Sequence, residues 1–206
     1  MNITRRDFTR LAAAFGAVSF FGIGCTAAEE TLKEGMKMPV KVKKDKILVA
    51  YYSWSGNTKF AAETISAALG GVKLIEIKAV KPYPSGMNEC CDEAEGECKG
   101  KKLREIEPTG VNVADYDAVL VGTPNWYGTM APPVRTFLVN NLEALKGKTV
   151  CLFQTHGGGG MQRVGADFSE LMSGAKVLPA KAFGGSSIRS NVEALRKFST
   201  DRITAE

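Results

Sequence analysis

The feature that most constrains this chain is a short hydroxyl-rich segment between a predicted strand and a predicted helix. Residues 46–52 form an apolar run of strand length that is rich in β-forming side chains. Residues 59–69 repeat apolar side chains at helical spacing, and two glycines follow as a stop signal. Residues 53–58, Ser-Trp-Ser-Gly-Asn-Thr, therefore connect a buried strand to the first turn of a helix. Such a turn is suited to binding an anion.

The side chains of this turn favour a single terminal phosphate. A helix N-terminus offers unpaired backbone N–H groups and the positive end of the helix dipole. The hydroxyls of Ser53, Ser55 and Thr58 supply three further donors. Asn57 adds an amide, and Gly56 allows close approach of the backbone. The segment lacks lysine, arginine and the phosphate-loop pattern of nucleoside triphosphatases. An ordinary helix cap is the alternative interpretation.

The segment from Ser53 to Thr58, with Trp54 at its variable second position, resembles the phosphate-binding loop of the flavodoxins. In that family the pattern Ser/Thr-x-Ser/Thr-Gly-Asn-Thr holds the 5′-phosphate of FMN. The resemblance implies an α/β fold, a three-layer flavodoxin-like sandwich around a five-stranded parallel sheet of order 2-1-3-4-5. Such a sheet binds its ligand at the carboxyl ends of the strands. The resemblance extends from about residue 46 to residue 203.

A second segment follows the predicted strand 117–122, a continuous apolar run of the kind that is buried on both faces in parallel sheets. Residues 123–133 then read as a loop with prolines and two adjacent aromatic residues. In the flavodoxins a loop here lays an aromatic ring on the flavin, which implies that role for Trp126. Packing of Trp126 onto the core is the alternative. The residues implied to contact the flavin are Thr123, Pro124, Asn125, Trp126, Tyr127 and Gly128.

A third segment, Thr155 and His156 followed by four glycines, comes after the predicted strand 148–154. Consecutive glycines are costly for folding, and their benefit is close approach of backbone N–H groups to a ligand. The flavodoxin resemblance implies that Thr155, His156, Gly157 and Gly158 contact the polar edge of the flavin. His156 is the only histidine. Beside a flavin its charge would couple to reduction near neutral pH; a structural role is the alternative.

These three segments together predict FMN as the cofactor. Each follows a different strand, and the carboxyl ends of parallel strands share one edge of the sheet. One segment suits a phosphate, one offers an aromatic ring, and one is bare backbone. A G-x-G-x-x-G pattern does not follow the first strand, which argues against NAD bound in the Rossmann manner.

The amino terminus has the composition of an export signal. The pair Arg5 and Arg6, with Phe8 after it, precedes an uncharged stretch that is too short for a transmembrane helix. It resembles the twin-arginine signal of bacteria, with a chance arginine pair in an ordinary signal as the alternative. Cys25 could be the lipidated first residue of a lipoprotein, and cleavage near residues 27–28 is the competing interpretation.

We therefore expect a twin-arginine-type signal peptide over residues 1–28, a linker over 29–45 and a flavodoxin-like FMN-binding domain over 46–206. The expected location is the periplasm or the cell envelope. The net charge of +5 is mild and the basic residues are not interleaved with aromatics, so nucleic-acid binding is not expected. The expected partner is a redox protein or a small-molecule electron acceptor, with membrane contact only through an N-terminal lipid anchor.

The segment around Cys90, Cys91 and Cys98 is unusual because acidic residues surround its three cysteines. We expect only a short helix from about residue 89, because two glycines interrupt it. A disulfide is expected first, since disulfides persist in exported proteins, and free thiols second. A soft-metal site is poorly supported, because histidines are lacking nearby. A redox relay between thiols and flavin is a further alternative.

The other predicted elements are strands 72–78 and 175–183 and helices 134–145, 164–172 and 191–203.

Three functions are compatible with this pattern. The first is an electron carrier that shuttles electrons through the flavin, with no catalytic residue assigned and no metal. The second is an FMN-dependent NAD(P)H:quinone-type oxidoreductase, which needs an open site over the flavin. The third is a binding module that has lost FMN, and the intact phosphate loop argues against it. Short flanking loops favour the carrier.

Overall fold

The computed structural model describes residues 38–206, which form one compact unit. The predicted signal peptide, Cys25 and the first part of the predicted linker lie outside the described residues.

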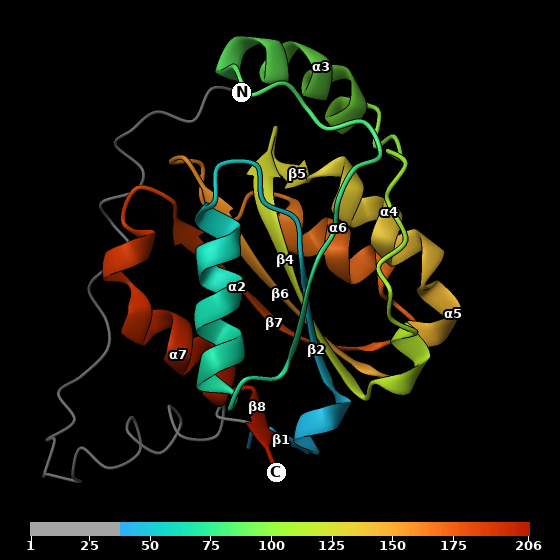
Figure 1. The fold of residues 1–206 in the computed structure, drawn as a ribbon, viewed down its shortest axis with the longest axis vertical. Helices are drawn as coiled ribbons and strands as arrows, with labels where there is room; N and C mark the ends of the chain where they lie inside the picture. The colour runs from blue at the N-terminus through green and yellow to red at the C-terminus, as the bar shows by residue number, and fades with distance from the viewer. Residues whose placement is uncertain (1–37) are drawn as a thin grey trace, which may run out of the picture. The chain divides into compact units, whose positions relative to one another are not determined.

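A mostly parallel sheet forms the middle layer of the domain (Figure 1). Its strands are rich in Val, Ile and Leu, and every residue of the first central strand is buried, as expected for a sheet covered on both faces. The strand order is β3-β2-β4-β6-β7, which is 2-1-3-4-5 when these five strands are counted along the chain. The strands are β2 (Ile47–Tyr51), β3 (Lys73–Glu76), β4 (Ala118–Trp126), β6 (Thr149–His156) and β7 (Lys176–Gly184).

Helices cover both faces of this sheet and produce a three-layer sandwich (Figure 1). One face packs against α2 (Asn57–Ala68) and α7 (Val192–Thr200) through one apolar cluster. The other face packs against α4 (Pro132–Asn140) and α6 (Val164–Leu171) through a second cluster. In Figure 1, α3 (Met87–Lys99) lies beyond the sheet edge where β4 ends. The three-layer α/β fold expected from the sequence is confirmed.

The loop expected over residues 123–133 is largely a hairpin. Strand β4 continues to Trp126 and pairs in antiparallel fashion with β5 (Thr129–Met130), which adds a short sixth strand. The turn between them has Tyr127 at φ 51° and Gly128 at φ 82°. Both residues therefore adopt the left-handed conformation that tight hairpin turns require. The hairpin fixes the position of Trp126 more firmly than an open loop would.

The structure contains a second, two-stranded sheet, formed by residues that were predicted to belong to the linker and to the end of the last helix. Residues of the linker form β1 (Val40–Val42), which pairs in parallel with β8 (Ile203–Ala205). Helix α7 therefore ends at residue 200, within the range 191–203 that was expected from the sequence. The pair lies at the opposite end of the domain from α3 (Figure 1).

Two further helices differ from their predicted bounds. The predicted helix 134–145 is divided into α4 and the short α5 (Leu142–Leu145), because the Asn141 side chain donates to the Phe137 carbonyl at 2.7 Å between them. Helix α3 runs for 13 residues and is not stopped by Gly96. Short 3-10 turns complete the domain: η2 (Lys44–Lys46), η3 (Val113–Asp115) and η4 (Ile188–Ser190). Over residues 38–206, no helix is both long and apolar enough to cross a bilayer.

Candidate functional site

The hydroxyl-rich turn has the geometry of an anion site. Gly56 caps α2 with φ at 85°, and its N–H donates to the Ser53 hydroxyl at 3.1 Å. The first backbone bond of the helix runs from the Phe60 N–H to the Gly56 carbonyl at 3.0 Å. The N–H groups of residues 57–59 therefore have no partner within the helix. The first turn carries no acidic side chain, so nothing there opposes a bound phosphate.

A buried hydroxyl pair joins this turn to the glycine-rich segment. The Thr58 and Thr155 hydroxyls lie 2.8 Å apart, and both residues are buried. A β-carbon on Gly185 would lie 2.7 Å from the Asn57 amide nitrogen and 3.3 Å from the His156 carbonyl oxygen. The backbone after β7 thus approaches both segments closely, and a larger residue at position 185 would displace the Asn57 side chain. Three chain segments therefore meet at the N-terminus of α2.

The predicted stacking residue, Trp126, belongs to a cluster of three aromatic rings. Its ring centroid lies 5.6 Å from that of Tyr52 and 4.8 Å from that of Tyr83, with nearly perpendicular planes. Both tyrosines are buried, whereas Trp126 is only partly buried. We call Tyr52, Tyr83 and Trp126 the aromatic cluster. Burial raises the pKa of both tyrosines, so their hydroxyls remain protonated at neutral pH.

The hairpin and the glycine-rich segment are tied together by Asn125. Its amide donates to the Gly160 carbonyl at 2.8 Å and to the Gln162 side chain at 2.9 Å, and its oxygen accepts from the Gly128 N–H at 3.0 Å. Of the predicted site residues, Asn125 therefore joins the two segments, and Gly128 holds the Asn125 side chain within the hairpin. Thr123 is fully buried, and its hydroxyl donates to the Pro124 carbonyl and accepts from the Ala131 N–H.

Tyr127 points away from the aromatic cluster. The residue is 47% exposed, and its hydroxyl donates to the Cys91 carbonyl of α3 at 3.0 Å. Burial of its hydroxyl, its bond to Cys91 and nearby thiols and acids raise the pKa of Tyr127 to about 12. The residue thus connects the hairpin to α3.

The glycine-rich segment presents bare backbone to open space. A β-carbon added at Gly157 or Gly158 would meet no atom within 4 Å, and Gly158 has φ at 140°. The Gly158 N–H donates to His156 Nδ1 at 3.1 Å. Gln154 lies directly before this segment and is completely buried, with its amide nitrogen bonded to the Gly160 carbonyl. Its amide oxygen is the one buried side-chain polar atom without a partner in the described region.

A pocket of about 370 Å³ adjoins the phosphate turn on the β3 side. Its walls include Ser53 and Trp54 of the turn, Tyr52 and Tyr83 of the aromatic cluster, and the charged side chain of Glu107. The Trp54 indole donates to the Pro84 carbonyl at 2.8 Å and so faces the segment after β3 rather than the α2 N-terminus.

The cysteines of α3 are free thiols, so the disulfide expected first is wrong for residues 38–206. Cys90 and Cys98 are eight residues apart on one helix, which separates them by about 12 Å, beyond the reach of about 7 Å for a disulfide. Burial raises the pKa of Cys98 to about 12 and also raises that of Cys90. No cluster of three metal ligands occurs in the described part of the chain, so a soft-metal site has no support there.

Sequence reasoning missed Tyr52 and Tyr83, which complete the aromatic cluster, and Gly185, which closes on the α2 N-terminus. The Pro-Tyr-Pro sequence at residues 82–84 was a usable signal, because a tyrosine between two prolines has a restricted backbone. The glycine pair at residues 184–185 also followed a predicted strand. It could have been grouped with the other segments at the carboxyl edge of the sheet.

The arrangement fits the phosphate and ring of a flavin mononucleotide. Gly56 faces open space, so an anion could approach the α2 N-terminus closely. Trp126 supplies a partly exposed ring, and residues 157–158 supply exposed backbone near the same edge. The N–H groups at the α2 N-terminus and the hydroxyls of residues 53–58 are neutral donors, which suits a singly substituted phosphate held without a metal.

Comparisons with known proteins agree with this geometry. A family model described as flavodoxin matches residues 46–198. A flavoprotein from Lactobacillus acidophilus NCFM, solved in complex with FMN, is 28% identical with a TM-score of 0.61, covering 73% of this chain and 98% of that one. A Bacteroides eggerthii DSM 20697 protein assigned as a flavoprotein is 28% identical with a TM-score of 0.59, covering 73% and 97%. Megasphaera elsdenii flavodoxin, at 20% identity and a TM-score of 0.51, shares the fold, covering 75% and 96%.

Proposed function

The chain belongs to the flavodoxin family, and we propose that it is an FMN-binding redox protein that shuttles electrons through the flavin. FMN is the cofactor. The phosphate lies at the N-terminus of α2, held by the N–H groups of its first turn and by the hydroxyls of residues 53–58. The flavin ring lies beside Trp126 and the glycine-rich segment.

The observation that carries this proposal is the bond between the Thr58 and Thr155 hydroxyls. It joins the phosphate turn to the segment that would contact the polar edge of the ring. The surface proposed for the phosphate of FMN and the surface proposed for its ring therefore adjoin each other at one edge of the sheet. The solved relative from L. acidophilus, which contains FMN, supports the same cofactor here.

Bound FMN supplies one-electron and two-electron redox chemistry, while the protein supplies binding and orientation. Trp126 would offer its ring as a stacking surface for the bound flavin, which would disfavour an electron-rich reduced flavin and lower the reduction potential. Asn125 and the glycine-rich segment set the position of the backbone donors near the ring. The partner is a redox protein or a small-molecule electron acceptor.

We propose further that the protein is exported by the twin-arginine route. The support is the Arg5-Arg6-x-Phe8 sequence before an uncharged stretch. This route suits a protein that acquires its cofactor in the cytoplasm. Replacing both arginines with lysine is expected to leave the protein in the cytoplasmic fraction, and unchanged export would contradict this route. Mass spectrometry of the exported form distinguishes lipidated Cys25 from cleavage near residues 27–28.

A second candidate is an FMN-dependent NAD(P)H:quinone-type oxidoreductase. The observation that favours it is the pocket of about 370 Å³ beside Trp54, which is large enough for a small aromatic molecule. An enzyme of this kind is reduced rapidly by a nicotinamide, whereas a carrier is not.

The direct test of the cofactor compares FMN with riboflavin, which lacks the phosphate. Titration of apoprotein should show FMN binding about a hundredfold more tightly, because the phosphate makes several charge-assisted hydrogen bonds. Equal affinity for the two compounds would contradict a phosphate site at α2. Failure to bind either compound would contradict the proposed function as a whole.

A further inference from the structure

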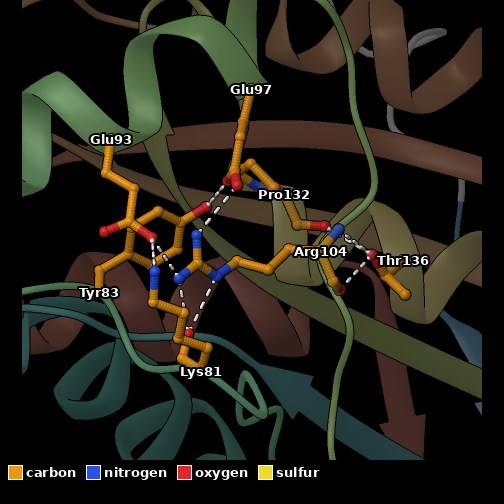
Figure 2. Close-up of polar contacts among 7 residues, drawn as sticks. All are labelled: Lys81, Tyr83, Glu93, Glu97, Arg104, Pro132 and Thr136. Carbon is orange, nitrogen blue, oxygen red and sulfur yellow. Dashed lines mark hydrogen bonds and ion pairs between the residues drawn. The ribbon is translucent and has the colours of Figure 1, made fainter.

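Arg104 is a buried arginine at the centre of a polar network beside the aromatic cluster (Figure 2). Its guanidinium donates twice to the Lys81 carbonyl, from Nε at 3.0 Å and from Nη2 at 2.7 Å. It also donates to Glu97 at 3.0 Å and to Glu93 at 2.7 Å, both on α3. The residue is only 7% exposed, so these charged bonds are weakly screened by water and salt.

The same guanidinium lies over one member of the aromatic cluster. Its central carbon is 3.7 Å from the centroid of the Tyr83 ring, and the Tyr83 hydroxyl donates to Glu97 (Figure 2). Tyr83 in turn packs edge-to-face against Trp126. Arg104 is thus separated from the predicted stacking residue by one aromatic ring.

Helix α3 depends on this network for its attachment. The residues that it buries against the domain are all small: Cys90, Ala94 and Cys98. Small side chains bury little apolar area, so they contribute little to holding a helix in place. The polar contacts that hold α3 run from Arg104 to Glu93 and Glu97, from Lys81 to Glu93 and from Tyr83 to Glu97, with a further bond from Tyr127.

The backbone of Arg104 is fixed to the core side of the domain. Its N–H donates to the Thr136 hydroxyl of α4 at 2.9 Å, and its carbonyl accepts from the same hydroxyl at 2.7 Å. The residue therefore connects three parts of the chain: α4, α3 and the segment of residues 81–83. A lysine could not replace it, because only the planar guanidinium fork reaches several acceptors while it stacks on a ring.

We propose that Arg104 is a positioning residue for the flavin site. It fixes Tyr83, and through it Trp126, and it holds α3 beyond the carboxyl edge of the sheet. This inference rests on the proposed function, because the ring that Trp126 would contact is the flavin.

The test compares Arg104→Gln and Arg104→Lys with a matched control, Arg202→Gln. Arg202 also donates to backbone carbonyls, those of Pro179 and Phe198, and its guanidinium lies 4.2 Å from the centroid of the Phe198 ring. It differs in location, because it adjoins β8 at the opposite end of the domain. Three quantities are measured: FMN affinity, near-ultraviolet circular dichroism of the apoprotein, and the rates at which Cys90 and Cys98 react with a thiol reagent.

Both Arg104 variants should bind FMN roughly tenfold to a hundredfold more weakly, because buried partners are left unpaired and the ring contact shifts. Their aromatic dichroism should change, and thiol labelling should accelerate because α3 is released. The Arg202 variant should leave all three quantities unchanged. Glu97→Gln, which removes one arm of the network and leaves Arg104 in place, should show the same changes to a smaller extent and serves where Arg104→Gln does not fold.

Folded Arg104 variants with wild-type FMN affinity would overturn the proposal. Equal losses of affinity in the Arg104 and Arg202 variants would also overturn it, because the effect would then be general destabilisation. If the wild-type apoprotein binds no FMN, the proposed function fails and with it the role of Arg104 toward a flavin. In that case the dichroism and labelling rates still decide whether Arg104 holds Tyr83 and α3.

Discussion

Single residues at the phosphate turn contribute in two different ways, through backbone conformation and through hydroxyl groups. Gly56 provides the left-handed conformation that turns the chain into α2. Thr58 provides a buried hydroxyl in the first turn of α2 that contacts Thr155. Substitutions can separate these two contributions, because one acts on folding and binding and the other mainly on binding.

Removing the hydroxyls of Ser55 and Thr58 together should weaken FMN binding by more than about a hundredfold, since each hydrogen bond to a charged group contributes about 1.5–3 kcal/mol. Titration of the double variant Ser55→Ala/Thr58→Ala with FMN measures this effect. Thr64→Ala is the control, because the Thr64 hydroxyl lies on the same helix and bonds only to the Phe60 carbonyl at 2.9 Å. If the folded double variant binds FMN with unchanged affinity, the assignment of the phosphate site to this turn is contradicted.

Gly56→Ala should destabilise the protein by about 1–2 kcal/mol, because a side chain disfavours the left-handed conformation. Gly71→Ala is matched to it, since Gly71 has φ at 80° against 85° for Gly56, and neither position has an atom within 4 Å of an added β-carbon. Urea unfolding should give similar losses for the two variants. Only Gly56→Ala should also weaken FMN binding. If the two variants bind FMN equally well, the phosphate does not occupy the open space beside Gly56.

The residues of the site could be predicted from the sequence where a local pattern carries the function. Residues 53–58 and 155–158 lie at the predicted strand ends, and the structure brings them together through the two threonine hydroxyls. Arg104 could not be found in this way, because its importance depends on contacts between distant segments. The role of His156 as a charge coupled to the flavin remains a prediction.

Among the elements, helix α6 is joined to its neighbours through one buried carboxylate. Asp167 accepts from the Thr129 hydroxyl of β5 at 2.6 Å and from Lys101 at 3.0 Å, and lies 3.9 Å from Arg135 of α4. Burial alone would raise the pKa of Asp167. The hydrogen bonds from Thr129 and Lys101, with the nearby positive charges, outweigh burial and hold that pKa below its usual value.

The lowered pKa of Asp167 makes the stability of the domain depend on pH in one direction. The ion pair contributes fully above the unfolded-state pKa of roughly 3.9 and loses its contribution as pH falls through the lower folded-state pKa. Asp167→Asn should cost about 3 kcal/mol at pH 7, because it leaves Arg135 buried without its charge partner. The difference between the variant and wild type should shrink below about pH 4.

Urea unfolding between pH 3 and pH 7 measures this dependence. Asp117→Asn is the control, because Asp117 pairs with Lys148 at the same distance of 3.0 Å but its side chain is 60% exposed. The control should lose less than about 1 kcal/mol. A pH-independent difference between Asp167→Asn and wild type would contradict the role given to the carboxylate.

The sequence predicted the elements that depend on local periodicity and missed those that depend on distant partners. The five strands of the main sheet and the helices α2 and α6 lie close to their predicted ranges. Strands β1 and β8 were missed, because each has only three residues and forms by pairing with the other across the length of the chain. Helix α3 was predicted too short, because its glycines reduce helix propensity while Arg104 supplies tertiary contacts that compensate.

The whole domain separates structural and binding regions at opposite ends of its sheet. The β1–β8 pair lies at one end, and the α2 N-terminus, the hairpin and α3 lie at the other (Figure 1). The apolar clusters on the two faces of the sheet hold these ends at a fixed separation.

This separation is common to doubly wound folds, in which ligands lie at the carboxyl ends of the strands. The fold could therefore be predicted from the order of the three binding segments. Whether the protein is an electron carrier or an enzyme depends on which molecules reach the flavin at the carboxyl edge of the sheet. The order of the strands in the sequence does not determine which molecules these are. Redox behaviour of the whole protein distinguishes the two.

The most direct test of the central proposal is a visible spectrum of the purified protein during anaerobic photoreduction, with a parallel addition of a nicotinamide. An electron carrier should be a yellow protein that passes through a stable one-electron-reduced form and does not react with the nicotinamide. Rapid bleaching by the nicotinamide, without a one-electron form, would contradict the carrier and identify a reductase. Protein that stays colourless after addition of FMN would contradict the flavin site itself.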